Sequence, residues 1–303
     1  MSVRVRVPAS AANLGPGYDA FGLALGLHNE FEAELAPEWR VEVGGEGAGG
    51  LATGADNEVA RAMARAFAEA GRPELRAEIE CHNGIPVGRG LGSSAAAIVG
   101  GLVLADALAG GPLGRSRILE LAVEIEGHAD NVAAALYGGF TVTAPPPNVT
   151  CARIDPARGL AAVVVIGEQP LSTALARQVL PAEVPHADAA ANAGAAALVA
   201  LGIAFGEPDY LVAGLSDRIH ESYRALLVPD FDAVKSALAA VAAAPAVLSG
   251  AGPTMLSLVQ GDDDVHALDR ARSIADAVRP ALAEIGRGRV IALEVDRTGA
   301  VVL

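Results

Sequence analysis

The chain has 303 residues, 52% of them hydrophobic, and a formal net charge of −14. This length allows one large or two moderate domains with a substantial core. The negative charge, without any basic stripe, argues against nucleic acid or an anionic membrane surface as a partner. Two cysteines without ligand-type spacing, Cys81 and Cys151, argue against a disulfide or a zinc site and favour a reducing compartment.

In the N-terminal half, hydrophobic periodicity predicts a mixture of strands and helices. The first seven residues alternate charged and apolar side chains, as a strand does, and lack the apolar region of a signal peptide. A glycine-rich surface loop is expected at residues 44–54. The strands are expected at residues 3–7, 41–43 and 75–82, and the helices at residues 57–70, 93–108 and 116–126.

Pro145, Pro146 and Pro147 interrupt the pattern and mark a domain boundary within residues 145–158. Strands and helices mix on both sides of it, which predicts an α+β protein of two domains. The uncharged stretch 189–206 approaches the length of a membrane span, but its alanine, glycine and Asn192 favour a buried core helix. Beyond the boundary, strands are expected at 160–166 and 289–295, a strand-loop-strand at 247–259, and helices at 173–180, 187–205, 208–223, 230–243 and 262–285.

The passage 86–96, P-V-G-R-G-L-G-S-S-A-A, places glycine at every second position before two serines. Glycine allows a tight turn and a close approach of the backbone to a ligand. The first turn of the following helix offers free N–H groups and the positive end of its dipole to an anion. The passage has neither the lysine of a P-loop nor the third glycine of a dinucleotide fingerprint. It predicts a phosphate cradle, although such a loop alone is often only a turn.

Two more glycine loops flank it in the chain: residues 7–22, V-P-A-S-A-A-N-L-G-P-G-Y-D-A-F-G, and residues 247–258, V-L-S-G-A-G-P-T-M-L-S-L. The three loops, in this order, resemble the superfamily of galactokinase, homoserine kinase, mevalonate kinase and phosphomevalonate kinase, and within it most closely the homoserine kinases. Tyr18 stands where that family usually has phenylalanine. The resemblance implies an ATP-binding N-terminal domain (1–155) with a ribosomal-protein-like fold, including a left-handed crossover. It implies a ferredoxin-like C-terminal domain (156–303), with the active site between the two.

The activity that this resemblance implies is the ATP- and Mg²⁺-dependent phosphorylation of the side-chain hydroxyl of L-homoserine, a step of threonine biosynthesis in the cytoplasm. The resemblance does not determine the oligomeric state, and a homodimer is one possibility. A sister kinase acting on mevalonate or another small alcohol is the first alternative, and would want an aspartate at position 131. A catalytically inactive nucleotide- or amino-acid-binding regulator is the second, and predicts erosion of the loop or of the metal ligands.

By the same resemblance, the phosphate loop binds ATP and Ser94 turns its hydroxyl towards Mg²⁺. Magnesium takes one or two protein oxygens, so a carboxylate should be the second ligand. Glu120 is the candidate, because the family places this carboxylate eleven residues before the position of Asn131. Glu124 shares its helix face and is the rival, Glu126 is expected to point elsewhere, and all three could simply be solvated. The residues assigned to ATP are Pro86, Val87, Gly88, Arg89, Gly90, Leu91, Gly92, Ser93, Ser94, Ala95 and Ala96.

The motif G-H-A-D-N-V at residues 127–132 matches the homoserine kinases, which have asparagine where mevalonate-type kinases have a proposed aspartate base. An amide cannot accept the proton. The hydroxyl proton is therefore expected to pass to the γ-phosphate directly or through water, and Asn131 to act by positioning. His128 is expected to contact the substrate, and Asp130 to cap or support.

Homoserine carries an ammonium and a carboxylate, which call for an anion and for arginine. Asp19 suits the ammonium, and family counterparts of Asn13 contact the amino acid. Thr173 and Arg177, four residues apart, resemble a substrate-binding segment of the homoserine kinases, and Arg224 matches a second carboxylate-binding arginine. The third loop, 249–254, is expected to buttress the phosphate loop or to close over the site.

Overall fold

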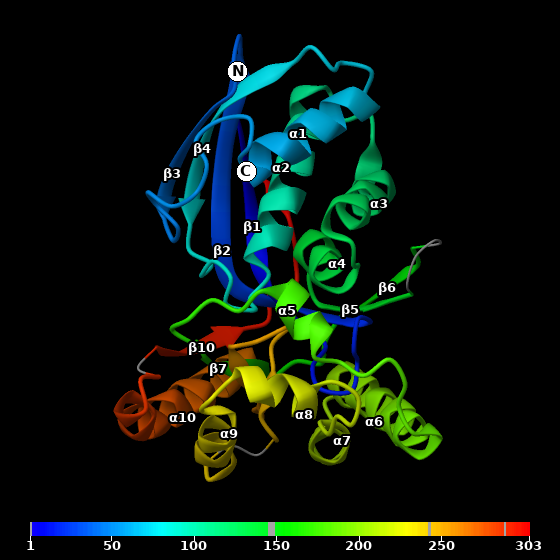
Figure 1. The fold of residues 1–303 in the computed structure, drawn as a ribbon, viewed down its shortest axis with the longest axis vertical. Coiled ribbons are helices and arrows are strands. Elements are labelled where there is room, and N and C mark those ends of the chain that lie inside the picture. Colours follow the sequence, from blue (N-terminus) through cyan, green and yellow to red (C-terminus); the bar gives the residue numbers. More distant parts are fainter. Residues whose placement is uncertain (1, 145–148, 242–243, 288) are drawn as a thin grey trace.

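A computed structural model describes residues 2–144, 149–241, 244–287 and 289–303. Figure 1 shows two halves, one above the other, each with a sheet covered by helices, and both termini in the upper half. This is the mixed α and β architecture that the sequence predicts. Pro145, Pro146 and Pro147, which mark the predicted boundary, lie outside the described residues.

The upper sheet has the order β11-β1-β2-β4-β3, and β5 extends it by pairing with β2 and β6. All of its pairs are antiparallel except β3 with β4. Sequence periodicity does not predict the longest strand, β2, because its first part is buried on both faces and shows no alternation of apolar and polar residues. The strands are β1 (Val3–Ala12), β2 (Phe21–Ala36), β3 (Arg40–Gly45), β4 (Arg76–Asn83), β5 (Phe140–Thr143), β6 (Cys151–Ile154) and β11 (Val301–Val302).

Four helices cover one face of this sheet (Figure 1). The most deeply buried is α2 (Ser93–Leu108), which follows the phosphate loop and packs against both β1 and α1. Its apolar character all round is typical of a helix inside a core. The others are α1 (Glu58–Glu69), α3 (Gly114–Glu126) and α4 (Asp130–Tyr137).

The lower sheet is antiparallel with the order β10-β7-β9-β8. In chain order this is fourth, first, third, second, the ferredoxin-like arrangement that was predicted. Its strands are β7 (Leu160–Val165), β8 (Val247–Leu248), β9 (Met255–Gln260) and β10 (Val290–Glu294), and its helices are α5 (Thr173–Gln178), α6 (His186–Phe205), α7 (Pro208–Gly214), α8 (Glu221–Arg224), η1 (Ala225–Leu227), α9 (Phe231–Ala239) and α10 (Asp264–Glu284).

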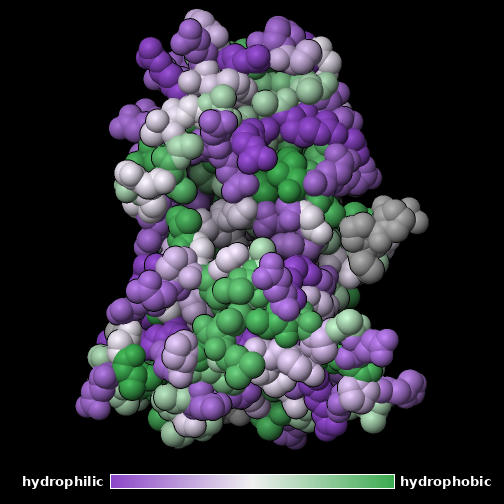
Figure 2. Space-filling model, in the orientation of Figure 1, coloured by the Kyte–Doolittle hydropathy of each residue, from purple (hydrophilic) through white to green (hydrophobic). Residues whose placement is uncertain are grey.

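Two predicted helices of this half differ in the structure. The single helix expected at 208–223 is broken into α7 and α8, because the carboxylate of Asp217 accepts hydrogen bonds from the backbone N–H groups of Ile219, His220 and Glu221. The helix α6 was expected to be buried, but only 22% of its most apolar window is. By length and composition alone, α6 is long and apolar enough to cross a membrane. A single such helix is weak evidence for a membrane span. Figure 2 shows further apolar surface in the lower half, where α5 and α8 lie.

Candidate active site

A cavity of about 110 Å³ lies where the three glycine loops meet. Residues far apart in the sequence line it, from the first loop, the phosphate loop, the start of α4, and α5 and α8. The predicted site residues that line this cavity are Asn13, Asp19, Gly88, Arg89, Gly90, Gly92, Ser93, Ser94, His128, Asn131, Thr173, Arg177 and Arg224.

The phosphate loop holds three glycines, Gly88, Gly90 and Gly92, in the left-handed conformation, with φ of 67°, 79° and 69°. The N-terminus of α2 has no side-chain cap, so its first N–H groups remain available to a ligand. A Cβ at Gly92 would lie 2.1 Å from Ser10 Oγ, and one at Gly90 would lie 2.4 Å from the Ser249 carbonyl oxygen. The loop therefore requires glycine for both conformation and space. Other predicted ATP-binding residues, Pro86, Leu91, Ala95 and Ala96, are buried and do not line the cavity.

The third loop supports the phosphate loop from behind. Ser249 Oγ donates a hydrogen bond of 2.6 Å to the carbonyl oxygen of Gly90. The Asn13 amide bridges the first and third loops: Nδ2 donates to the Gly250 carbonyl oxygen at 2.8 Å, and Oδ1 accepts from the Asp19 backbone N–H at 3.0 Å. Asn13 therefore links the first and third loops, and because it also lines the cavity its contact with a substrate stays a prediction.

The structure places the predicted metal carboxylate away from the cavity. Glu120 lies outside the cavity, with its side chain 51% exposed and paired with Arg117 at 2.6 Å. Glu124 likewise pairs with Arg65 at 2.9 Å. The α3 carboxylate that lines the cavity is that of Glu126, whose Oε2 accepts a 2.8 Å hydrogen bond from Ser94 Oγ.

The reason for this difference is the short connection between α3 and α4. Only residues 127–129 separate the helices, so the last residue of α3 already lies beside the first turn of α2. A fixed spacing of eleven residues assumes a longer connection than this chain has. Burial raises the pKa of Glu126, and the Ser94 hydrogen bond and the His128 charge oppose that shift. Glu58, at the start of α1, brings a second carboxylate to 3.3 Å from Ser94 Oγ.

A hydrogen-bonded chain connects the G-H-A-D-N-V motif to β1. His128 Nδ1 lies 2.8 Å from Asp130 Oδ1, which also accepts the backbone N–H of Asn131 at 2.7 Å. Ser10 Oγ donates to Asn131 Oδ1 at 2.9 Å, which leaves the Asn131 Nδ2 group for the cavity. Burial lowers the pKa of His128, but Asp130 and Glu126 raise it more, so the net shift is upwards. Ser10 is a site residue that sequence reasoning missed.

Two arginines, Arg177 and Arg224, line another part of the cavity, and both contact Tyr18. The Arg177 guanidinium makes a bidentate pair with Asp19, both contacts being 2.8 Å, and donates to the Tyr18 hydroxyl at 3.0 Å. The Arg224 guanidinium carbon lies 5.2 Å from the centre of the same Tyr18 ring. The hydroxyl that distinguishes Tyr18 from the usual phenylalanine is therefore used to hold Arg177.

Arg224 is buried and only 2% exposed. Its Nε donates to the Ala176 carbonyl oxygen at 3.2 Å and its Nη1 to the Gly250 carbonyl oxygen at 3.1 Å. Among the described residues no acceptor lies within hydrogen-bonding distance of Nη2. Arg224 therefore keeps two N–H bonds for a ligand, and two such bonds match the oxygens of a carboxylate.

A second cavity of about 370 Å³ adjoins the first at Gly88, Ser93 and Ser94. Sequence reasoning missed it, because its walls come from β2, β3, β4 and α1 and share no motif. Apolar side chains dominate it, including Phe31, Val43, Leu51, Val59, Val87 and Ala97. Its place beside the phosphate loop suits the flat, largely apolar base of a nucleotide.

Family models match the chain in both halves. The N-terminal domain model of the GHMP kinases matches residues 57–139, and the C-terminal model of the same family matches residues 197–279. These ranges include the phosphate loop, Glu126 and the G-H-A-D-N-V motif in the first match, and Arg224 and the third loop in the second.

Among curated proteins, the chain is 41% identical to a homoserine kinase of Picosynechococcus sp. over 100% of this chain and 99% of the relative. It is 44% identical to a homoserine kinase of Streptomyces coelicolor, with 88% of each chain covered. The solved structure of a homoserine kinase from Cytophaga hutchinsonii matches with a TM-score of 0.88 and 28% identity, covering 100% of this chain and 97% of the other. With the family models, these matches show that the chain belongs to the GHMP kinases.

Proposed function

We propose that this kinase transfers the γ-phosphoryl group of ATP to the side-chain hydroxyl of L-homoserine. The observation that carries the proposal is the part of the cavity lined by Asp19, Arg177 and Arg224. There, Asp19 offers a carboxylate for an ammonium, and the buried Arg224 keeps two N–H bonds free for a carboxylate. An amino acid bound between them would direct its side chain towards Asn131 and the phosphate loop. The similarity to homoserine kinases along the whole chain supports the same substrate.

The residues present fit a nucleotide with Mg²⁺. Three left-handed glycines and an uncapped helix N-terminus suit phosphate oxygens. Ser94 Oγ and Glu126 Oε2, 2.8 Å apart, offer the hard oxygen ligands that magnesium prefers. No cluster of three His, Cys, Asp or Glu side chains suited to a metal occurs in the described ranges, but magnesium bound to phosphates needs only one or two protein ligands. When bound, the metal would neutralise phosphate charge.

The residues of the chain would then act by placement. Asn131 Nδ2, fixed by the Ser10 hydrogen bond to its Oδ1, would hold the acceptor oxygen in line with the γ-phosphorus. Because an amide cannot accept a proton, the hydroxyl proton would leave to the phosphate or to water. Arg177 would balance the charge of Asp19 and add positive charge beside the substrate carboxylate.

The remaining assignments follow from the same proposal. We propose an ATP-binding domain at 1–155 and a ferredoxin-like domain at 156–303, with the short strand β11 returning from the second domain to pair with β1 in the first. Threonine biosynthesis in the cytoplasm would be its setting, without nucleic-acid or membrane partners and with homodimer formation open.

A coupled assay of ADP release with homoserine, mevalonate, galactose and shikimate tests the proposal. Homoserine should support turnover with a kcat/KM at least 100-fold above the others. Arg224→Ala should raise KM for homoserine roughly 10- to 150-fold, the value of a charge-assisted hydrogen bond, and change KM for ATP little. Preferential turnover of mevalonate would establish the sister-kinase alternative instead.

A further inference from the structure

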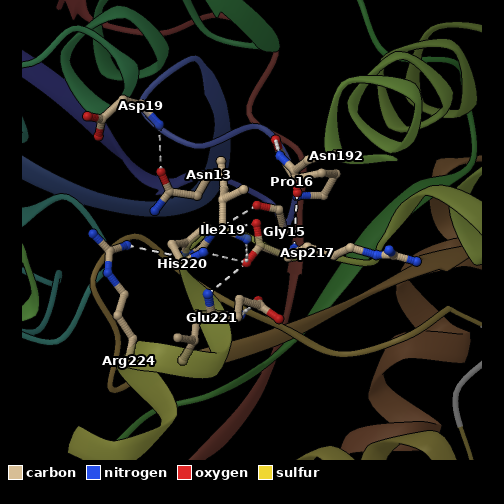
Figure 3. Close-up of polar contacts among 12 residues, drawn as sticks. Asn13, Gly15, Pro16, Asp19, Asn192, Asp217, Ile219, His220, Glu221 and Arg224 are labelled. Carbon is tan, nitrogen blue, oxygen red and sulfur yellow. Dashed lines mark hydrogen bonds and ion pairs between the residues drawn. The ribbon is translucent and has the colours of Figure 1, made fainter. Parts of the chain in front are cut away.

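His220 lies at the N-terminal end of α8 with no exposed surface, beside the guanidinium of Arg224 (Figure 3). Its Nε2 is 2.8 Å from the carbonyl oxygen of Gly15. A carbonyl oxygen can only accept, so this ring nitrogen carries the proton. The other ring nitrogen, Nδ1, is then an acceptor, and it lies 3.4 Å from Nη1 of Arg224. The geometry thus fixes one neutral tautomer that bonds the first loop on one side and Arg224 on the other.

The groups around His220 agree with a neutral ring. The Tyr18 ring lies 5.3 Å away between centroids, and the Asp217 Oδ1 atom lies 3.6 Å from Nε2, beyond hydrogen-bonding distance. Burial lowers the pKa of His220 and the neighbouring Arg224 lowers it further, while Asp217 opposes them. A proton on Nδ1 would also set one N–H group against another.

We propose that His220 is a positioning residue for substrate binding: its Nδ1 fixes the Arg224 guanidinium so that Nη2 meets the substrate carboxylate. Three of the five N–H bonds of Arg224 are held by His220, Gly250 and Ala176. These come from three separate elements, which leaves the guanidinium one orientation. The inference rests on the proposed function, because it takes an amino-acid carboxylate as the ligand of Arg224.

His220 also stabilises the first loop, residues 7–22, which contains residues in a disfavoured backbone conformation. Asn13, Leu14 and Asp19 are non-glycine residues with φ of 69°, 48° and 56°, a conformation that side chains disfavour. His220 bonds the Gly15 carbonyl, and Asn192 Nδ2 bonds the Pro16 carbonyl at 2.8 Å. Loss of the Gly15 contact should therefore affect folding, whereas loss of the Arg224 contact should affect substrate binding. Two variants can separate these effects.

His220→Gln keeps an amide N–H near the position of Nε2 but has no acceptor near Nδ1. It should raise KM for homoserine roughly 3- to 10-fold, the effect of one ordinary hydrogen bond, with kcat and KM for ATP within twofold of wild type. His220→Asn keeps an acceptor near Nδ1 and loses the Gly15 contact. It should lower the Tm while leaving KM for homoserine within twofold of wild type.

A double-mutant cycle with Arg224→Ala completes the test. On that background His220→Gln should leave KM for homoserine unchanged, because the group it positions is gone. An equal rise of KM on both backgrounds, or an equal rise of KM for ATP, would overturn the inference. If His220→Gln does not fold, His220→Asn decides alone: a more than tenfold rise in its homoserine KM contradicts the proposal. Wild-type enzyme inactive on homoserine would instead refute the proposed function.

Discussion

At the scale of single residues, the site depends on which face of a helix a side chain occupies. Glu120 and Glu126 lie six residues apart on α3, which turns them by about 240° from one another. One therefore meets Arg117 on the surface and the other meets Ser94 at the cavity. Composition could not distinguish them, because both are glutamates on the same amphipathic helix.

Replacing these two glutamates by glutamine tests the assignment of the metal ligand. Glu126→Gln should lower kcat about 100-fold and raise the Mg²⁺ concentration needed for half-maximal rate, because a charged oxygen ligand is lost. Glu120→Gln, the matched control on the same helix, should stay within twofold of wild type. Steady-state kinetics over a magnesium titration measure both, and the reverse ranking would restore Glu120 as the ligand.

At the scale of secondary-structure elements, glycines in α2 set how closely its neighbours pack. A Cβ at Gly100 would lie 2.4 Å from the Phe31 ring, and one at Gly101 would lie 2.5 Å from the Val59 carbonyl oxygen. The first glycine allows β2 to approach α2, and the second allows α1 to approach it. The close packing of α1 and α2 in turn brings Glu58 to Ser94.

Two glycine-to-alanine substitutions separate packing from helix propensity. Gly101→Ala should destabilise the protein by about 1–3 kcal/mol, since the rigid backbone of α1 must move. Gly194→Ala on α6, where a Cβ meets no atom within 4 Å, should stabilise it by about 0.5–1 kcal/mol. Urea unfolding measures both free energies, and a neutral Gly101→Ala would show that α1 adjusts freely.

Another connection between elements is the ion pair of Asp230, before α9, with Arg287, after α10. The two side chains are 19% and 6% exposed, and Arg287 Nη1 also donates to the Pro253 carbonyl oxygen in the third loop at 3.0 Å. The hydrogen bond from Arg287 lowers the pKa of Asp230 from its ordinary value of 3.8. The pair therefore stabilises the lower half and the loop that supports the phosphate cradle.

This lowered pKa predicts the pH dependence of stability. The folded state holds the Asp230 proton more weakly than the unfolded state, so the contribution is complete above about pH 5 and is lost as the pH falls through the lowered pKa. Asp230→Asn should cost about 1.5–3 kcal/mol at pH 7 and make the loss of stability below pH 4 less steep.

The exposed pair of Asp269 with Arg272 provides the control for that measurement. Asp269→Asn should change the free energy of unfolding by less than about 1 kcal/mol, as expected for a solvated ion pair. Urea titrations at pH 7, 5 and 3 measure the three proteins. An unchanged slope in Asp230→Asn would show that other carboxylates carry the acid sensitivity.

At the scale of the whole molecule, one of two hydrophobic clusters spans both halves, and the other lies within the lower half. A single cluster of buried residues includes Val7 and Leu25 of the upper sheet and Leu160, Val164 and Leu256 of the lower sheet. The cavity of the proposed active site lies where these halves meet, with walls from both. The relative position of Asp19 and Arg224 thus depends on the packing of the whole chain.

Thermal unfolding should therefore be a single cooperative transition, with a calorimetric enthalpy equal to the van't Hoff enthalpy. Differential scanning calorimetry and circular dichroism should report the same midpoint. An amino-acid substrate and a nucleotide, which at the proposed site would contact both halves, should raise that midpoint together. Two separated transitions would mean that residues 1–155 and 156–303 unfold independently.

The sequence by itself determined the local features of this protein. Most strands and helices followed from periodicity, and the phosphate loop followed from the glycines at 88, 90 and 92, because a left-handed backbone beside a helix N-terminus requires that residue type locally. The ordered set of three loops was enough to indicate the family. Such features depend on residues that are close together in the chain, and the sequence gives the order of those residues directly.

The tertiary structure decided what depends on distance in space. It places the carboxylate of Glu126, and not that of Glu120, beside Ser94, because the helix face and the length of the next connection determine which carboxylate reaches that serine. It added Ser10, His220 and the apolar cavity, whose partners lie on other elements. It also divides the predicted helix 208–223 into α7 and α8, since the Asp217 carboxylate accepts hydrogen bonds from the backbone N–H groups of the following residues. Side chains separated by more than a hundred residues become neighbours only through packing, and no local pattern encodes that.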